Sequence, residues 1–221
     1  MTLDTKRLPT YSHNEEVMNS VTHLIGLLFG IGTLIFFIVY HIIHKCDFLF
    51  MLPFYTYSLV MMMVFFVSSF YHSSKFGSKR RATSRIVDHC DIYAFVAATY
   101  FPICMYGIAN KGVATAILIV EVVLMLVGIA LNLIPTNSKA IKIITYLIYI
   151  VDGWILIFFY PFGIGLEFYV FLFVLLGGII YSIGAITYAI GSKKAWLHSV
   201  FHIFVVLAAM TQFVGILFLL F

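Results

Sequence analysis

Charged residues are scarce in this chain, where they make up only 10% of 221 residues. An ordinary soluble domain carries about 25%. Hydrophobic residues reach 63% instead, which leaves too few polar side chains to cover a water-facing globule. These proportions exclude a soluble fold and predict one membrane domain with lipid as its main solvent.

Cysteine is equally sparse. Cys46, Cys90 and Cys104 are too few and too scattered for a disulfide framework or a CxxC metal knuckle, so we interpret them as packing residues. The chain also lacks a water-exposed basic run with interleaved aromatic residues, and we therefore expect no nucleic acid partner.

Long apolar runs account for most of the chain. A bilayer core about 30 Å thick requires about 20 apolar residues per helix. The runs cover roughly residues 21–43, 51–72, 88–110, 113–133, 141–160, 167–190 and 196–221. The sequence thus predicts an all-α membrane protein, a seven-transmembrane helical bundle over residues 21–221, preceded by a polar segment at 1–20. The first run is too long for the apolar core of a cleaved signal peptide.

Lysine and arginine are distributed unevenly between the alternate loops of this topology. If the N-terminus lies in the cytoplasm, eleven basic residues fall on the cytoplasmic side and two on the other side, which satisfies the positive-inside rule. The eleven are Lys6, Arg7, Lys75, Lys79, Arg80, Arg81, Arg85, Lys139, Lys142, Lys193 and Lys194, and the two are Lys45 and Lys111. We therefore predict a cytoplasmic N-terminus, an outside C-terminus and a multi-pass protein of the plasma (inner) membrane.

Proline and glycine mark several breaks between the runs. Pro135 follows the fourth run, and residues 161–163 separate the fifth from the sixth. Pro102 falls inside the third run, where we expect a kink. Gly26 and Gly30 form a GxxxG pattern in the first run, which indicates close helix packing.

Four ionisable residues lie where an ionisable side chain is costly. His72 ends the second run, Asp88 begins the third, and His198 and His202 open the seventh, all at the predicted cytoplasmic level. His198 and His202 are four residues apart and so share a helix face, which allows both imidazoles to bind one ion. Three imidazoles with an open fourth position form a catalytic zinc arrangement. Ser68, one turn before His72, could polarise a carbonyl or support a ligand.

Simpler interpretations remain open for the same residues. The two histidines of the seventh run could face lipid headgroups, Asp88 could cap a helix beside Arg85, and Ser68 could be a packing serine. His23, with Glu15, Glu16 and Asn19, is typical of a capped helix start at the membrane interface. Glu121 and Asp152 have no obvious sequence partner and could be buried and protonated or face a cavity.

Four motifs together resemble the bacterial hemolysin III family. They are EEVMNSVTH from Glu15 to His23, SSFYH from Ser68 to His72, DHCDIY from Asp88 to Tyr93, and HSVFH from His198 to His202. That family belongs to the progestin and adipoQ receptor superfamily, which includes the adiponectin receptors and is related to the alkaline ceramidases. The resemblance covers essentially the whole chain.

The resemblance implies seven helices with a cytoplasmic N-terminus. It also implies a zinc ion held by His72, His198 and His202, with Asp88 contacting the metal through water and Ser68 beside it. Two positions depart from the pattern. Gln212 stands where members often carry a further histidine, and Asp152 is acidic where an apolar residue is expected.

Three functions are compatible with this sequence. The first is a zinc-dependent intramembrane hydrolase that cleaves a lipid amide or ester, with Asp88 moving the proton and Ser68 stabilising the oxyanion. Its substrate would be a membrane lipid whose acyl chain enters from the bilayer. The alternatives are a membrane-damaging hemolysin or pore, with cytolysis as its outcome, and a receptor-like sensor whose Zn2+ is structural. The sequence does not indicate an oligomeric state.

Overall fold

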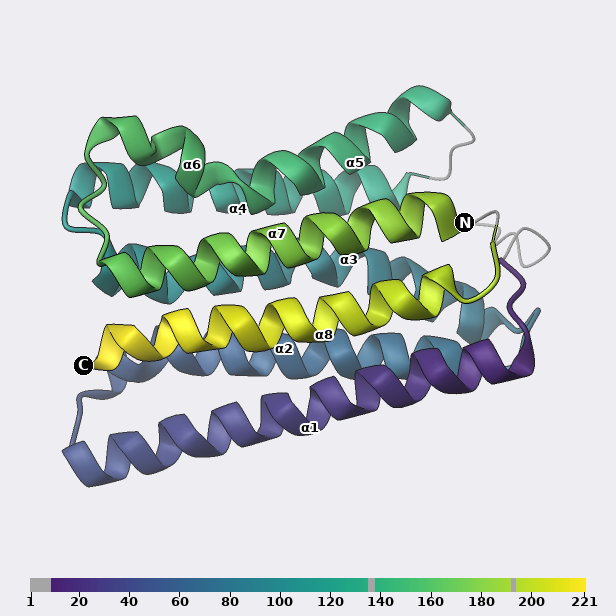
Figure 1. Ribbon diagram of the computed structural model, residues 1–221, viewed down its shortest axis with the longest axis horizontal. Helices are drawn as coiled ribbons and strands as arrows, with labels where there is room; N and C mark the ends of the chain where they lie inside the picture. The colour runs from purple at the N-terminus through teal and green to yellow at the C-terminus, as the bar shows by residue number, and fades with distance from the viewer. Residues whose placement is uncertain (1–8, 135–137, 192–193) are drawn as a thin grey trace.

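The computed structural model describes residues 9–134, 138–191 and 194–221. The sequence predictions that concern Lys6, Arg7, Pro135 and Lys193 lie outside the described residues. Within them the protein is an elongated bundle of roughly parallel helices (Figure 1). It is therefore an all-helical, multi-pass membrane protein, as its composition predicts.

The chain runs back and forth along the bundle axis, with α6 continuing in the general direction of α5 (Figure 1). Their bounds are α1 His13–His44, α2 Phe48–Ser73, α3 Lys79–Pro102, α4 Lys111–Leu133, α5 Lys139–Gly153, α6 Ile155–Phe159, α7 Phe168–Gly191 and α8 Leu197–Leu217. Helices α1 to α5 pack on one another in consecutive pairs, α7 packs on α8, and α8 also packs against α1. Helices from both ends of the sequence therefore lie side by side.

Five of the described helices are long and apolar enough to cross a membrane: α1, α2, α4, α7 and α8. A sixth span results if α5 and α6 are taken together as one bent segment. Helix α3 does not qualify, because Arg80, Arg81, Arg85 and Asp88 occupy its first half. The count of seven spans thus stays a prediction that depends on α3.

Helix α3 begins nine residues earlier than the apolar run that predicted it. The Ser78 side chain accepts a hydrogen bond from the backbone N–H of Arg81 and caps the helix there. Asp88 consequently lies inside the helix, and the interpretation of Asp88 as its N-cap is wrong. At Pro102 the α-helix gives way to a π-helical turn over Ile103–Gly107, the adjustment expected where proline removes a backbone donor.

The fifth apolar run is also interrupted. Its two parts, α5 and α6, meet at Trp154 with a bend of 59°. Glu121 of α4 and Asp152 at the end of α5 are both fully buried and interact with each other near this bend. The polar neighbour that the sequence did not reveal for Asp152 is therefore on α4.

One end of the bundle collects the helix ends that carry the candidate site. Helices α1, α3, α5 and α8 begin there, and α2, α4 and α7 end there, on the right in Figure 1. The C-terminus lies at the opposite end. Since His72 is in the last turn of α2 and His198 in the first turn of α8, this topology places them at one level.

Close packing of α1 on α2 depends on Gly26, where an added Cβ would lie 2.7 Å from the buried Phe65 ring. We expect Gly26→Val to lower the free energy of unfolding by about 1–3 kcal/mol, because the overpacked side chain forces the ring to shift. Thermal unfolding in detergent measures this. Gly32→Val is the matched control on the same helix, since no atom lies within 4 Å of its added Cβ. Equal losses in both variants would contradict the prediction.

Candidate metal centre

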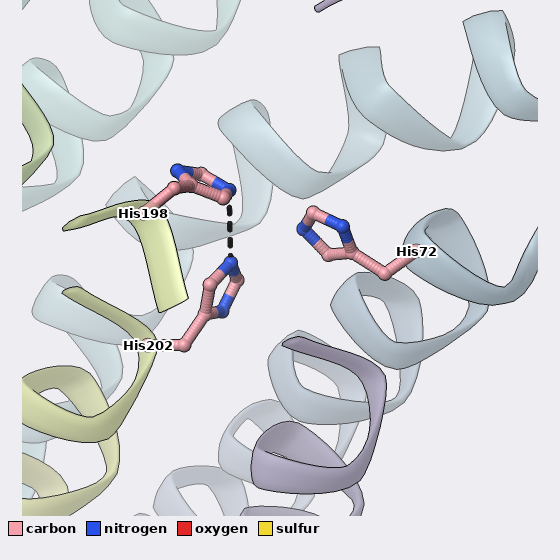
Figure 2. Close-up of side chains that lie close together, drawn as sticks. All are labelled: His72, His198 and His202. Carbon is pink, nitrogen blue, oxygen red and sulfur yellow. Dashed lines mark hydrogen bonds between the residues drawn. The ribbon is translucent and has the colours of Figure 1, made fainter. Parts of the chain in front are cut away.

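Three histidines from two helices converge at the end of the bundle where α8 begins. His72 comes from α2, and His198 and His202 come from α8. Each offers one ring nitrogen, and these nitrogens all lie within 4.8 Å of one another. The Nε2 atoms of His198 and His202 are 3.0 Å apart, and His72 faces them across a short gap (Figure 2). We call this group the histidine triad.

The His72 ring is oriented by α1. Its Nδ1 lies 2.7 Å from Oε2 of Glu16, and Asn19 Nδ2 lies 3.3 Å from the same nitrogen. A carboxylate only accepts hydrogen bonds, so His72 donates from Nδ1 and its Nε2 keeps a lone pair. This Nε2 is buried and has no hydrogen-bond partner among the described residues. It is therefore free to act as a ligand.

Glu16 is itself held by a buried arginine of α3. Arg81 donates to the other Glu16 carboxylate oxygen and to the Ser74 carbonyl oxygen, 3.0 Å away. The guanidinium also lies over the Tyr71 ring, 4.8 Å from its centroid, and the residue is only 2% exposed. Helices α1, α2 and α3 are thus joined by charged groups directly behind His72.

The His202 ring has its own contact with α1. Nδ1 of His202 lies 2.6 Å from Nε2 of His23, and both rings are almost fully buried. His23 and Glu16 are seven residues apart, two helical turns, and so lie on one face of α1. A single face of α1 therefore contacts ligands from two other helices.

The start of α1 covers the third ligand. The Tyr11 ring stacks on His198 with 4.5 Å between centroids and an interplanar angle of 11°. Burial raises the pKa of the Tyr11 phenol well above its ordinary value. Glu15 completes a capping box with Ser12 and also accepts a hydrogen bond from the backbone N–H of Trp196, at 2.7 Å. The residue before α8 is thus tied to the first turn of α1.

Asp88 and Ser68 lie next to the triad. The Asp88 carboxylate lies near Ser68 and His72, and its Oδ2 is 3.7 Å from Nδ1 of His89, while the Ser68 hydroxyl has no hydrogen-bond partner among the described residues. Ser68 is buried one turn before His72 on α2. His89 stands outside the triad, although it touches Asp88.

Several candidates from the sequence lie elsewhere. Glu121 and Asp152 form their own buried pair, away from the triad residues. Gln212 is two to three turns beyond His202. It packs against Gly177 of α7, and a Cβ added at Gly177 would lie 2.4 Å from the Gln212 side chain. The three cysteines are free, so no disulfide forms among them.

Sequence reasoning undervalued the polar face of α1. The sequence predicts a capped helix start for Glu15, Glu16, Asn19 and His23 and indicates no role for Tyr11. The cap exists, but only Ser12 and Glu15 form it. The three-and-four-residue spacing of Glu16, Asn19 and His23 was the available signal, because it places three polar groups on one helix face.

The chain is similar to known proteins over most of its length. The model of the haemolysin-III related family matches residues 11–213, which include every residue of the triad and of its α1 support. The chain belongs to the haemolysin-III related family. Among similar members, the hemolysin-3 homolog of Bacillus subtilis (strain 168) is 29% identical over 209 residues, covering 94% of this chain and 95% of that protein. Hemolysin-3 of Bacillus cereus is 30% identical over 205 residues, covering 92% and 91%.

The stability of this protein should depend on Arg81. Arg81→Gln leaves the Glu16 carboxylate without its cation, and breaking a buried ion pair costs about 3 kcal/mol. Thermal unfolding in detergent should show this loss. Arg80→Gln is the control, because Arg80 is exposed and its guanidinium lies over the Phe70 ring, 5.6 Å from the centroid. Similar unfolding temperatures for the two variants would refute the structural role of Arg81.

Proposed function

We propose that this protein is a zinc-dependent intramembrane hydrolase that cleaves an amide or ester bond of a membrane lipid. The observation that carries the proposal is the convergence of three buried imidazole nitrogens on one point at the end of an apolar bundle. Ionisable groups buried at such a position in a membrane protein are costly and mark functional sites.

The donor set suits zinc. Tetrahedral coordination with Zn–N bonds of about 2.0–2.1 Å places ligand nitrogens roughly 3.3 Å apart. The 3.0 Å between the Nε2 atoms of His198 and His202 is close to this value, and the buried Nε2 of His72 completes the set. Within the described residues no fourth histidine, cysteine or carboxylate joins the group. Three protein ligands with an open position are typical of catalytic rather than structural zinc.

A zinc ion at this site supplies a Lewis acid that polarises a carbonyl and activates water. The Asp88 carboxylate is proposed to accept the proton of the attacking water and to return it to the leaving amine or alcohol. Its proximity to Ser68 and His72 supports this role. Ser68 is proposed to donate a hydrogen bond to the oxygen that becomes negative as the carbonyl is attacked. The products are a fatty acid and the amine or alcohol that carried it.

The proposed orientation places this chemistry at the cytoplasmic face of the plasma membrane. Described basic residues crowd the end of the bundle that holds the triad: Lys75, Lys79, Arg80, Arg81, Arg85 and Lys194. Lys45 and Lys111 belong to the other end. The positive-inside rule favours the first end as cytoplasmic. Lipids of the inner leaflet would then present their carbonyls at the depth of the triad.

We propose that α3 is the remaining span of a seven-span bundle. With the π-helical turn it covers residues 79–107, about 43 Å at the rise of an α-helix, which exceeds the bilayer core. Its polar residues Arg81 and Asp91 are 2% and 3% exposed, so protein rather than lipid surrounds them. A helix packed between α2 and α4 needs less apolar surface than one that faces lipid.

The zinc content of the purified protein tests whether the histidine triad binds a metal. We expect purified wild-type protein to contain about one zinc per chain, and His198→Ala to lose most of it, because a site with two ligands binds zinc far more weakly. Metal analysis after dialysis measures this. His44→Ala, at an exposed position at the far end of α1, should keep the wild-type content.

Hydrolysis tests the chemistry. Zinc-loaded protein in detergent–lipid micelles should release fatty acid from a panel of N-acyl lipids and ceramides, detected by mass spectrometry. Asp88→Asn should lower turnover by about 100-fold or more while zinc remains bound, since it removes the proposed general base. A zinc-loaded protein that leaves the whole panel intact would refute the hydrolase and favour a receptor-like sensor with structural zinc.

The name of the Bacillus cereus relative, Hemolysin-3, suggests a second candidate function, membrane damage. Reconstituted protein and its His72→Ala variant distinguish the two. Release of a trapped dye from liposomes by both proteins equally would support a pore that does not need the triad. We expect neither protein to release more dye than escapes from liposomes without protein, because the buried polar side chains of the triad gather at one end of the bundle.

A further inference from the structure

We infer that His23 is a positioning residue that determines which ring nitrogen His202 presents to the metal. The inference rests on the metal centre proposed above and assigns a role to a residue outside the triad. It depends on one short contact, the 2.6 Å between Nε2 of His23 and Nδ1 of His202.

The two nitrogens of His202 have different neighbours. Nδ1 faces His23 on α1, whereas Nε2 lies 3.0 Å from Nε2 of His198. Only Nε2 is therefore directed toward the other ligands of the triad. A neutral imidazole carries one proton, so the position of that proton decides whether Nε2 can bind a metal.

The hydrogen bond between the two rings can run in either direction. If His23 donates, His202 accepts at Nδ1 and carries its proton on Nε2, where it would point at His198 and block a metal. If His202 donates from Nδ1, its Nε2 keeps the lone pair that a metal requires. Metal binding therefore requires His23 to act as the acceptor, with its own proton on Nδ1.

The surroundings of His23 restrict it to this task. Its ring is 3% exposed, packs edge-on against Phe65 with centroids 5.2 Å apart, and lies 4.0 Å from the His202 ring centroid. These contacts with Phe65 and His202 hold the buried ring in place, so Nε2 stays aimed at His202. A metal-binding histidine usually donates its other N–H to a carboxylate, a carbonyl or water, and here a neutral ring takes that place.

The two outer contacts of the triad differ in charge. A carboxylate, Glu16, faces Nδ1 of His72, whereas an imidazole, His23, faces Nδ1 of His202 and accepts its proton in the metal-binding arrangement inferred above. A carboxylate partner raises the electron density of the ligand ring more than a neutral partner does. His23 thus orients His202 without adding a negative charge next to the metal. The absence of that charge preserves the Lewis acidity of the site.

The test compares two substitutions in the full-length protein. His23→Leu removes the acceptor, and we expect zinc affinity to fall by about 10–100-fold, measured by competition with a chromophoric chelator. His23→Gln keeps an amide oxygen that can accept the same hydrogen bond, so its affinity should remain closer to wild type. The visible spectrum of the Co2+-substituted protein should change for His23→Leu, because His202 is no longer held in one orientation.

His41→Leu is the matched control. His41 lies on the same helix and also has a short ring contact, 2.6 Å from its Nδ1 to the Tyr55 hydroxyl, but at the other end of α1. This variant should bind zinc as wild type does.

Three results would overturn the inference. The first is wild-type affinity and an unchanged cobalt spectrum in His23→Leu. The second is an equal loss of affinity in His23→Gln and His23→Leu, which would mean that the ring is needed for packing only. The third is the absence of zinc from the wild-type protein, which would remove the proposed function as well. Zinc binding that depends on His23 without lipid hydrolysis would refute the hydrolase and leave the role of His23 intact.

Discussion

Hydrogen bonds from one polar face of α1 to buried imidazole rings are the interaction on which the rest of the site depends. A ring nitrogen buried without a partner is costly, and a ring free to rotate cannot hold a metal. Glu16 and His23 each occupy one Nδ1, on His72 and His202 respectively. The Nε2 atoms are thereby turned inward, where they meet. The triad belongs to α2 and α8, but its orientation is set by α1.

This arrangement also explains why charges are buried at this end of the bundle. Taking an ion pair out of water can cost more than the attraction of its charges returns, so the Glu16–Arg81 pair adds little net stability, although losing one partner alone is costly. It serves instead to hold a carboxylate at a fixed place behind His72. Arg81 is anchored in turn by the Ser74 carbonyl and the Tyr71 ring. Of the polar residues that keep α3 from resembling a membrane span, Arg81 thus supports the site and Asp88 lies next to it.

Different parts of the structure were predictable to different degrees. Hydropathy located α1, α2, α4, α7 and α8 because their lipid-facing surfaces must be apolar. The third apolar run, 88–110, overlaps α3 but leaves out the polar first half of that helix, and hydropathy missed the bend at Trp154, where an apolar run continues through a break in the helix. Membrane cost and the family resemblance singled out the triad histidines. The residues that orient them were overlooked, since an interfacial helix start and the support of a metal site use the same residue types.

By itself, the sequence determined that the chain lies in a membrane and which histidines are costly at their positions, because both follow from composition and from position along an apolar run. Only the tertiary structure decided which nitrogen of each ring faces inward. The two partners in each contact are distant in sequence: Glu16 and His72 are separated by 56 residues, and His23 and His202 by 179. No local pattern encodes such a pairing. It arises when α8 packs against α1 and the buried rings find the hydrogen-bonding groups that this contact brings to them.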